Sequence, residues 1–170
     1  MKRHRRIFIP ALFLLTSILL VSFVIEPAQS DSVKNLYQSD LTVKTLDGLD
    51  VPLKNFGGKA AVITFFATWC MPCVAEVPTF NKIHSQFKDK GVRVACVSLD
   101  GLPADAIRKF AKEWNIEYEL YLAGMEAPRK LGILLVPTTY LVRPNGEVVD
   151  TYTGLINENK LIEAVGALAR

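Results

Sequence analysis

Two cysteines separated by two residues are the part of this sequence that most clearly indicates chemistry. Cys70 and Cys73 follow an apolar run, residues 61–69, that predicts a buried strand, and residues 74–77 begin a helical pattern. A Cys-x-x-Cys at the change from strand to helix is a dithiol that can open and close. Unpaired backbone N–H groups and the helix dipole favour a thiolate at that point, and the thiolate is the form that attacks disulfides. The sequence therefore predicts redox chemistry.

The composition bounds the size of the protein and the partners it can have. The chain has 170 residues, of which 50% are hydrophobic and 22% charged, enough for one domain with a sizeable core. Its net charge of +3 belongs to the first thirty residues, and the remainder carries 16 positive and 16 negative groups. A neutral domain offers no footprint for nucleic acid, so we expect no nucleic-acid partner.

The first thirty residues have the pattern of a targeting segment. Residues 1–6 are basic, residues 7–25 are apolar and uncharged, and residues 28–30 include small residues of the kind that a signal peptidase reads. The pattern fits both a cleaved signal peptide and a single-span membrane anchor, because 19 apolar residues come close to spanning a bilayer. Either way the positive flank stays inside, which predicts a domain in the periplasm or on the outer face of the membrane, anchored or secreted.

Hydrophobic periodicity predicts the elements that must position the two cysteines. We assign residues 31–39 to a polar linker and residues 40–170 to one domain. Strands are expected at residues 41–43, 49–53, 61–66, 92–99, 118–122, 138–142 and 147–151. Helices are expected over residues 74–90 with a kink at Pro78, after Pro103, over residues 126–131 and after Asn157. This order predicts an α/β sandwich around one sheet.

Two motifs together resemble a known family. Residues 65–73, Phe-Phe-Ala-Thr-Trp-Cys-Met-Pro-Cys, and the later Val136-Pro137-Thr138 resemble the thioredoxin superfamily. Within it, residues 73–78 and the hairpin that ends in Gly58-Lys59 are similar to the membrane-tethered ResA/TlpA branch of redoxin, or AhpC/TSA-like, domains. The resemblance covers residues 40–169. It implies a thioredoxin-like α/β fold, a central mixed sheet flanked by helices with an N-terminal β-hairpin extension, and thiol–disulfide oxidoreductase activity.

The resemblance also implies roles for the motif residues. Cys70 would be the exposed nucleophile that forms a mixed disulfide with a client protein, and Cys73 would resolve it from one helical turn further in. Pro72 lies in the first helical turn, where a missing N–H costs nothing. The redox-active disulfide Cys70–Cys73 would serve without a separate cofactor. Met71 is neutral, which favours a mild reductant over a strong oxidant.

The later motif is expected to form the docking site for a client. Pro137 would be a cis proline beside the cysteines, which turns the backbone of Val136 outward to pair with an extended client segment. The alternative is an ordinary trans proline at the start of a strand. Trp69 is expected to shape and shield the site.

Glu76 is the candidate for proton transfer. It lies three residues after Cys73 on the same helical face, where it could exchange a proton as Cys73 attacks, although a solvated helix carboxylate is the alternative. Thr64 stands where thioredoxin has a buried aspartate, and a hydroxyl does not shuttle protons at ordinary pH, which places more weight on Glu76 or on water. Cys96 is expected to be a core residue, and His84 a packing or surface residue.

The sequence therefore predicts an extracytoplasmic thiol–disulfide oxidoreductase that reduces protein disulfides, for example in cytochrome c maturation. Expected partners are a disulfide-containing client, a membrane thiol electron donor and, if residues 1–30 remain uncleaved, the membrane itself; we expect a monomer and no metal. The alternative is a Cu(I)-binding metallochaperone that uses the same cysteines, since soft thiolates suit Cu(I). A thiol peroxidase is disfavoured, because Ile63 and Ala67 replace the proline and threonine of the Pro-x-x-x-Thr-x-x-Cys pattern.

Overall fold

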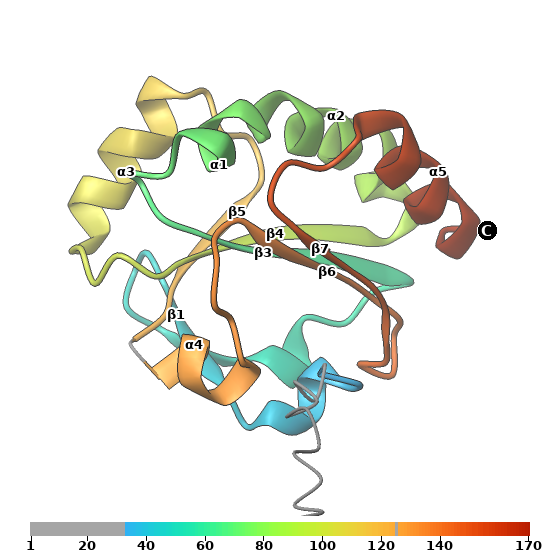
Figure 1. Ribbon diagram of the computed structural model, residues 1–170, viewed down its shortest axis with the longest axis horizontal. Coiled ribbons are helices and arrows are strands. Elements are labelled where there is room, and N and C mark those ends of the chain that lie inside the picture. Colours follow the sequence, from blue (N-terminus) through green and yellow to red (C-terminus); the bar gives the residue numbers. More distant parts are fainter. Residues whose placement is uncertain (1–32, 125) are drawn as a thin grey trace, which may run out of the picture. The chain divides into compact units, whose positions relative to one another are not determined.

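A seven-stranded mixed sheet runs through the centre of the domain (Figure 1). The computed structural model describes residues 33–124 and 126–170, so the predicted signal peptide or anchor lies outside the described residues. The strand order is β2-β1-β5-β4-β3-β6-β7, with β3, β4 and β5 parallel to one another and the other neighbours antiparallel. The strands are β1 (Thr42–Thr45), β2 (Asp50–Pro52), β3 (Ala60–Phe66), β4 (Val92–Ser98), β5 (Glu119–Leu122), β6 (Thr138–Val142) and β7 (Val148–Thr153).

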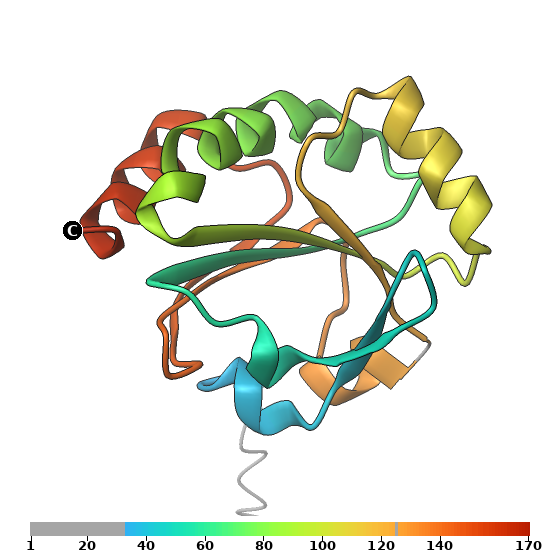
Figure 2. The ribbon, with the colours of Figure 1, turned by 180° about the vertical axis from the view of Figure 1, so that it is seen from behind.

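Helices cover both faces of the sheet, as Figures 1 and 2 show from opposite sides. One face carries α1 (Met71–Ala75), α2 (Val77–Phe87), α3 (Ala104–Glu113) and α5 (Glu158–Leu168). The other carries α4 (Glu126–Leu131) and the 3-10 turns η1 (Leu36–Ser39) and η2 (Leu53–Asn55). A third turn, η3 (Lys88–Lys90), follows α2. The predicted α/β class, central mixed sheet and hairpin are confirmed; the hairpin joins the sheet when β1 pairs with β5.

Strand β3 is buried on both faces, which explains its continuous apolar sequence. Val62 points into the core on the side of α1, α2, α3 and α5, whereas Ile63 and Phe65 point into the core on the side of α4. Because β3 and β4 are parallel, their carboxyl ends meet at the same edge of the sheet. The loop after β3, which leads to the cysteines, therefore leaves the sheet beside the loop after β4.

The segment predicted as a polar linker differs from that expectation over residues 35–39. Leu36 is completely buried in the core beside α4, and its backbone N–H donates to the Gly146 carbonyl at 2.8 Å. Asn35 donates from its side chain to the Asn145 carbonyl at 3.1 Å. Gly146 has a φ of +86°, and a Cβ there would lie 2.5 Å from Cγ of the Tyr37 ring, so the position favours glycine. Leu36 and Asn35, through hydrogen-bond partners more than 100 residues further along the chain, join this segment to the domain.

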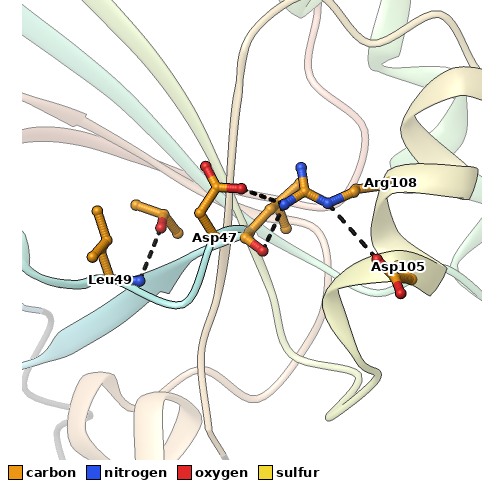
Figure 3. A network of polar contacts seen from close by, with 6 residues as sticks. Asp47, Leu49, Asp105 and Arg108 are labelled. Atoms are coloured by element: carbon orange, nitrogen blue, oxygen red, sulfur yellow. Dashed lines mark hydrogen bonds and ion pairs between the residues drawn. The ribbon is translucent and has the colours of Figure 1, made fainter.

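The turn of the β1–β2 hairpin is held against α3 by polar contacts (Figure 3). Arg108 donates to the Leu46 carbonyl at 2.8 Å and pairs with the carboxylate of Asp47, while Asp105 lies 3.9 Å away on the same helix. Within the turn, the Leu49 N–H donates to the hydroxyl of Thr45 at 3.1 Å. These contacts lie at the edge of the sheet on exposed side chains.

In the described part of the chain, no helix has both the length and the hydrophobicity that a membrane span needs.

Candidate active site

The two cysteines form a disulfide where β3 passes into α1. Cys70 is the N-cap residue of α1, with φ −88° and ψ 97°, and its Cα lies 5.3 Å from that of Cys73. The Cys73 backbone N–H points at the Cys70 sulfur at 3.3 Å. Pro72 lies in the first turn of α1, where its missing N–H leaves no bond unmade. Once the disulfide opens, the Cys73 N–H is placed to stabilise negative charge on Cys70.

The predicted exposure of Cys70 is wrong. Cys70 is only 4% exposed, less than the 6% of Cys73. The reason is the loop before β6, which packs against the disulfide so that the Val136 carbonyl oxygen lies 3.6 Å from the Cys70 sulfur. The exposed surface belongs instead to the residues on either side of Cys70, since Trp69 is 74% and Met71 65% exposed.

The Val136–Pro137 peptide bond is cis, as the resemblance implies, and Pro137 is buried. The Pro137 carbonyl accepts from the Gly154 N–H at 2.8 Å, and the Leu135 carbonyl accepts from the Thr138 hydroxyl at 2.7 Å. Between these two anchored residues, the N–H and C=O of Val136 make no hydrogen bond to any described backbone group. The loop thus offers one donor and one acceptor beside the disulfide.

Large exposed apolar side chains flank Cys70 and Val136 in the chain. We refer to Trp69, Met71, Leu134 and Leu135 as the apolar rim; Leu134 is 88% and Leu135 66% exposed. Between Trp69 and the two leucines lies a groove of about 360 Å³, lined by Ala67, Trp69, Leu99, Pro128 and residues 133–136. Apolar surface gathered around a groove in this way is typical of a site that contacts another protein. Trp69, expected to shape and shield the site, lines this groove.

Glu76 stands between α1 and α2, at the break that the sequence predicted as a kink near Pro78. The carboxyl group is buried, with Glu76 only 3% exposed, so it is not a solvated helix carboxylate. Its Oε1 accepts from the Ile156 N–H at 2.8 Å, whereas its Oε2 has no partner in the described structure. Burial raises the pKa of Glu76 from 4.5 to about 7, against the opposing effect of the Ile156 hydrogen bond.

A small cavity lined by both polar and apolar side chains, here named the inner chamber, lies behind the disulfide. Cys73 and Glu76 line it from the helix side, and Cys96 and Tyr118 line it from β4 and the segment before β5. Cys96 is a buried free thiol, as predicted, and Tyr118 lies next to it in the chamber lining. Burial raises the pKa of Cys96 far above its usual range, so this thiol stays protonated. Thr64 also lines the chamber, and its oxygen accepts from Thr139 at 2.9 Å.

Asp100 holds the loop that carries Trp69 and Cys70. Its carboxylate accepts from the Thr68 N–H at 3.0 Å, from the Thr68 hydroxyl at 3.1 Å and from the Ser98 hydroxyl at 2.8 Å. The ends of β3 and β4 are thereby joined just before the disulfide. Sequence reasoning missed this residue, although its place directly after a strong strand was a usable signal.

Sequence reasoning also missed Tyr118, Leu134 and Leu135. The two leucines stand immediately before Val136-Pro137, so their position beside a docking motif was the signal that could have found them. Tyr118 carried no local signal, because only the sheet brings it next to Cys96. His84 lies half-buried on α2, away from this arrangement of residues.

Metal binding receives no added support from the surroundings of the cysteines. Among residues 33–124 and 126–170, no group of three or more histidine, cysteine, aspartate or glutamate side chains could hold a metal ion. The Cu(I) alternative therefore depends on the two thiols alone.

Comparison with known proteins decides the family. Residues 38–151 match the model of the AhpC/TSA family. The chain belongs to the AhpC/TSA family. It is 30% identical over 126 residues to thiol-disulfide oxidoreductase ResA of Bacillus thuringiensis subsp. konkukian, covering 73% of this chain and 72% of that protein. ResA of Bacillus subtilis is 26% identical over 166 residues, covering 95% and 92%.

A solved structure agrees with this assignment. A protein provisionally identified as the thiol:disulfide interchange protein DsbE from Chlorobium tepidum matches with a TM-score of 0.69 and 27% identity, covering 81% of this chain and 98% of that one. The fold of this AhpC/TSA domain is therefore thioredoxin-like, and the protein is a thiol–disulfide oxidoreductase whose Cys70 and Cys73 form a disulfide.

Proposed function

We propose that this protein reduces disulfide bonds of client proteins outside the cytoplasm, with Cys70 as the nucleophile and Cys73 as the resolving thiol. One observation carries the proposal: the Val136 carbonyl oxygen lies 3.6 Å from the Cys70 sulfur, and exposed apolar residues flank both Cys70 and Val136 in the chain. An extended client segment that pairs with Val136 would bring its own disulfide to Cys70. The rim would bind the apolar side chains of that segment.

The reaction balances without any further cofactor. The Cys70 thiolate attacks one client sulfur, so a Cys70–client disulfide forms, the client disulfide breaks and the second client sulfur leaves as a thiolate that takes up a proton. Cys73 loses its proton and attacks the Cys70 sulfur, which restores the Cys70–Cys73 disulfide and releases the other client sulfur reduced. Two electrons pass from the protein dithiol to the client, and a thiol donor must replace them before the next cycle.

Glu76 is the base that we propose for the second step. Cys73 is buried, so its proton needs an acceptor within the protein. Glu76 lines the same cavity as Cys73, and its pKa of about 7 lets it gain and lose a proton near neutral pH. A general base works best when its pKa lies near the working pH.

The setting of the reaction follows from the targeting segment in the sequence. Residues 1–30 would export the domain and, if uncleaved, anchor it to the membrane. Outside the cytosol disulfides persist, so a reductase there needs electrons from a membrane thiol carrier. Apocytochrome c before haem attachment is the kind of client that we propose, because its paired cysteines must be reduced for that reaction.

An insulin-reduction assay with dithiothreitol as the electron donor tests the assignment of Cys70 as the nucleophile. The Cys70→Ser variant should reduce no insulin above the dithiothreitol background, whereas Leu49→Ser, an exposed substitution on the β1–β2 turn, should keep full activity. Full activity in Cys70→Ser would contradict the assignment of the nucleophile. Equilibration of the reduced protein with oxidised glutathione tests whether the protein donates or accepts electrons. A reductase should pass its electrons to glutathione and end with the Cys70–Cys73 disulfide. A dithiol that remains reduced contradicts the proposal.

A further inference from the structure

The inner chamber is a polar site in the middle of an apolar core. Five of the side chains around it carry polar or sulfur atoms, and five aromatic or aliphatic neighbours enclose them. Buried polar groups are unfavourable unless they find hydrogen-bond partners, so each of these groups needs one. The lining comprises Thr64, Phe66, Cys73, Glu76, Val77, Phe80, Cys96, Phe110, Ile116 and Tyr118.

One polar atom in the chamber has no partner among the described residues. Glu76 Oε2 is fully buried and unpaired, while the other carboxylate oxygen is held by the Ile156 N–H. The chamber leaves about 10 Å³ for the centre of a water molecule. That is close to the smallest space that holds one water, provided that two or more polar groups surround it. Glu76, Tyr118 and Cys96 supply those groups.

Tyr118 is placed to orient such a water. Its ring is fixed by an edge-on contact with Phe80, with ring centroids 5.9 Å apart, and Cys96 lies beside it in the chamber lining. Burial raises the pKa values of both Tyr118 and Cys96 far above neutrality, so both groups keep their protons. They therefore act as hydrogen-bond donors in the chamber, and Cys96 is not a third redox thiol.

We propose that Tyr118, next to Cys96, is a positioning residue for Glu76: one water in the inner chamber bridges the Tyr118 hydroxyl and Glu76 Oε2 and links the carboxylate to the Cys73 sulfur. When Cys73 attacks, its proton passes to this water as the water gives a proton to Glu76 Oε2. The proton transfer itself changes no bond between heavy atoms, and the S–S exchange that goes with it is the attack of Cys73 on the Cys70 sulfur described above. The inference rests on the proposed function, because it describes how the base of that reaction is held.

The groups that face Glu76 determine whether removal of the Tyr118 hydroxyl should raise or lower the pKa of Glu76. They are Cys73 from α1, Cys96 from β4, Tyr118 from the segment before β5 and the Ile156 N–H before α5; no lysine or arginine lines the chamber in the described structure. A hydroxyl that donates towards the carboxylate through water stabilises its charged form. Removing that hydroxyl should therefore raise the pKa of Glu76 and move proton uptake to higher pH.

Infrared titration of the oxidised protein tests this directly. The carbonyl band of protonated Glu76 is identified by its loss in Glu76→Gln, and its amplitude is followed against pH. The wild-type midpoint should lie near 7. In Tyr118→Phe, which keeps the ring and removes only the hydroxyl, the midpoint should rise by about one pH unit, as expected for one lost hydrogen bond to a charged group.

Two further variants keep the test decisive. Tyr140→Phe removes a buried tyrosine hydroxyl from the core on the opposite face of the sheet and should leave the midpoint unchanged. Cys96→Ala removes the sulfur next to Tyr118 and should raise the midpoint by a smaller amount. An unchanged midpoint in both Tyr118→Phe and Cys96→Ala, or an equal shift in Tyr140→Phe, would overturn the inference.

A crystal structure of the oxidised protein supplies the second readout. Electron density for one water within hydrogen-bond distance of both Glu76 Oε2 and the Tyr118 hydroxyl is expected, and an empty chamber would overturn the inference. Neither measurement uses a client protein. A protein that reduces no client disulfide would therefore refute the proposed function while the titration still decides the role of Tyr118.

Discussion

The two sides of the disulfide have opposite character. The apolar rim is hydrophobic and exposed, with Leu134 at 88% and Trp69 at 74%, whereas the inner chamber is polar and buried, with Glu76 at 3%. Each reverses the usual distribution of residue types between surface and core. Each also matches one requirement of disulfide exchange. A partner protein must bind through apolar contacts outside, and a proton must be held in a low-dielectric site inside.

Both regions lie at the edge of the sheet where β3 and β4 end, and different parts of the fold supply them. Loops supply most of the rim, namely the segment after β3 and the segment that precedes β6, while Met71 is the first residue of α1. Regular elements supply most of the chamber, since Thr64 and Cys96 come from β3 and β4 and Cys73 comes from α1. Loops can adapt to different partners, whereas strands and helices hold a proton-exchanging group in constant surroundings. The disulfide is the point where both regions meet.

The strongest way to separate the two regions is to remove the inner sulfur. Cys73→Ser leaves Cys70 and the apolar rim intact, so attack on a client should proceed but resolution should fail. Insulin reduction should fall at least about 10³-fold, as expected when one member of a catalytic pair is lost. Mass spectrometry should detect a client joined to Cys70 in this variant. The double variant Cys70→Ser/Cys73→Ser is the control, and any adduct in it would show that the trapped bond is elsewhere.

Replacing Glu76 by the neutral glutamine should change how the free energy of unfolding depends on pH. The pKa of Glu76 is about 7 in the folded protein and 4.5 in an ordinary setting, so folding favours the protonated form. That stabilisation is complete below pH 4.5 and is lost as pH rises through 7. A shift of this size corresponds to about 3 kcal/mol. Relative to Glu76→Gln, the wild type should therefore lose that much free energy of unfolding between pH 4.5 and pH 8.

Urea unfolding of the oxidised protein at several pH values measures this difference. Glu163→Gln, a change of the same kind on the exposed face of α5, is the matched control and should follow the wild-type profile. Parallel pH profiles for wild type and Glu76→Gln would contradict the burial of a titrating carboxyl in the chamber.

The sequence predicted the elements and the cysteine pair better than it predicted these two regions. Strand β3 was visible because a strand buried on both faces is continuously apolar, and the spacing of Cys73 and Glu76 placed them on one helical face. The chamber depends on the register that pairs Thr64 with Cys96 and on Tyr118, which arrives from another segment. Burial of Cys70 depends on Val136, 66 residues further along. Contacts of this kind leave no periodic signal in a sequence.

The apolar rim should affect client binding without affecting the chemistry. Leu135→Glu places a charge beside the groove next to Cys70, so KM for insulin should rise about 10-fold, the effect of losing one buried apolar side chain in a binding site. Reduction of a small aromatic disulfide, which needs no extended docking surface, should keep its rate. Leu49→Glu is the matched control, since Leu49 is 67% exposed and Leu135 is 66% exposed. Equal KM values in the two variants would show that the rim does not bind the client.

The contacts of Arg108 lie outside both regions and should show the smallest effect. Arg108→Ala removes the ion pair with Asp47 and the bond to the Leu46 carbonyl that hold the β1–β2 turn against α3 (Figure 3). Exposed ion pairs are worth about 0.2 to 1 kcal/mol and weaken as salt is added, so unfolding should become easier by that amount at low salt and by less in 1 M NaCl. Insulin reduction and its pH dependence should not change, because neither the rim nor the chamber touches this turn. A loss of activity in Arg108→Ala would mean that the edge of the sheet positions the disulfide, and the division of the site into an outer and an inner region would then be incomplete.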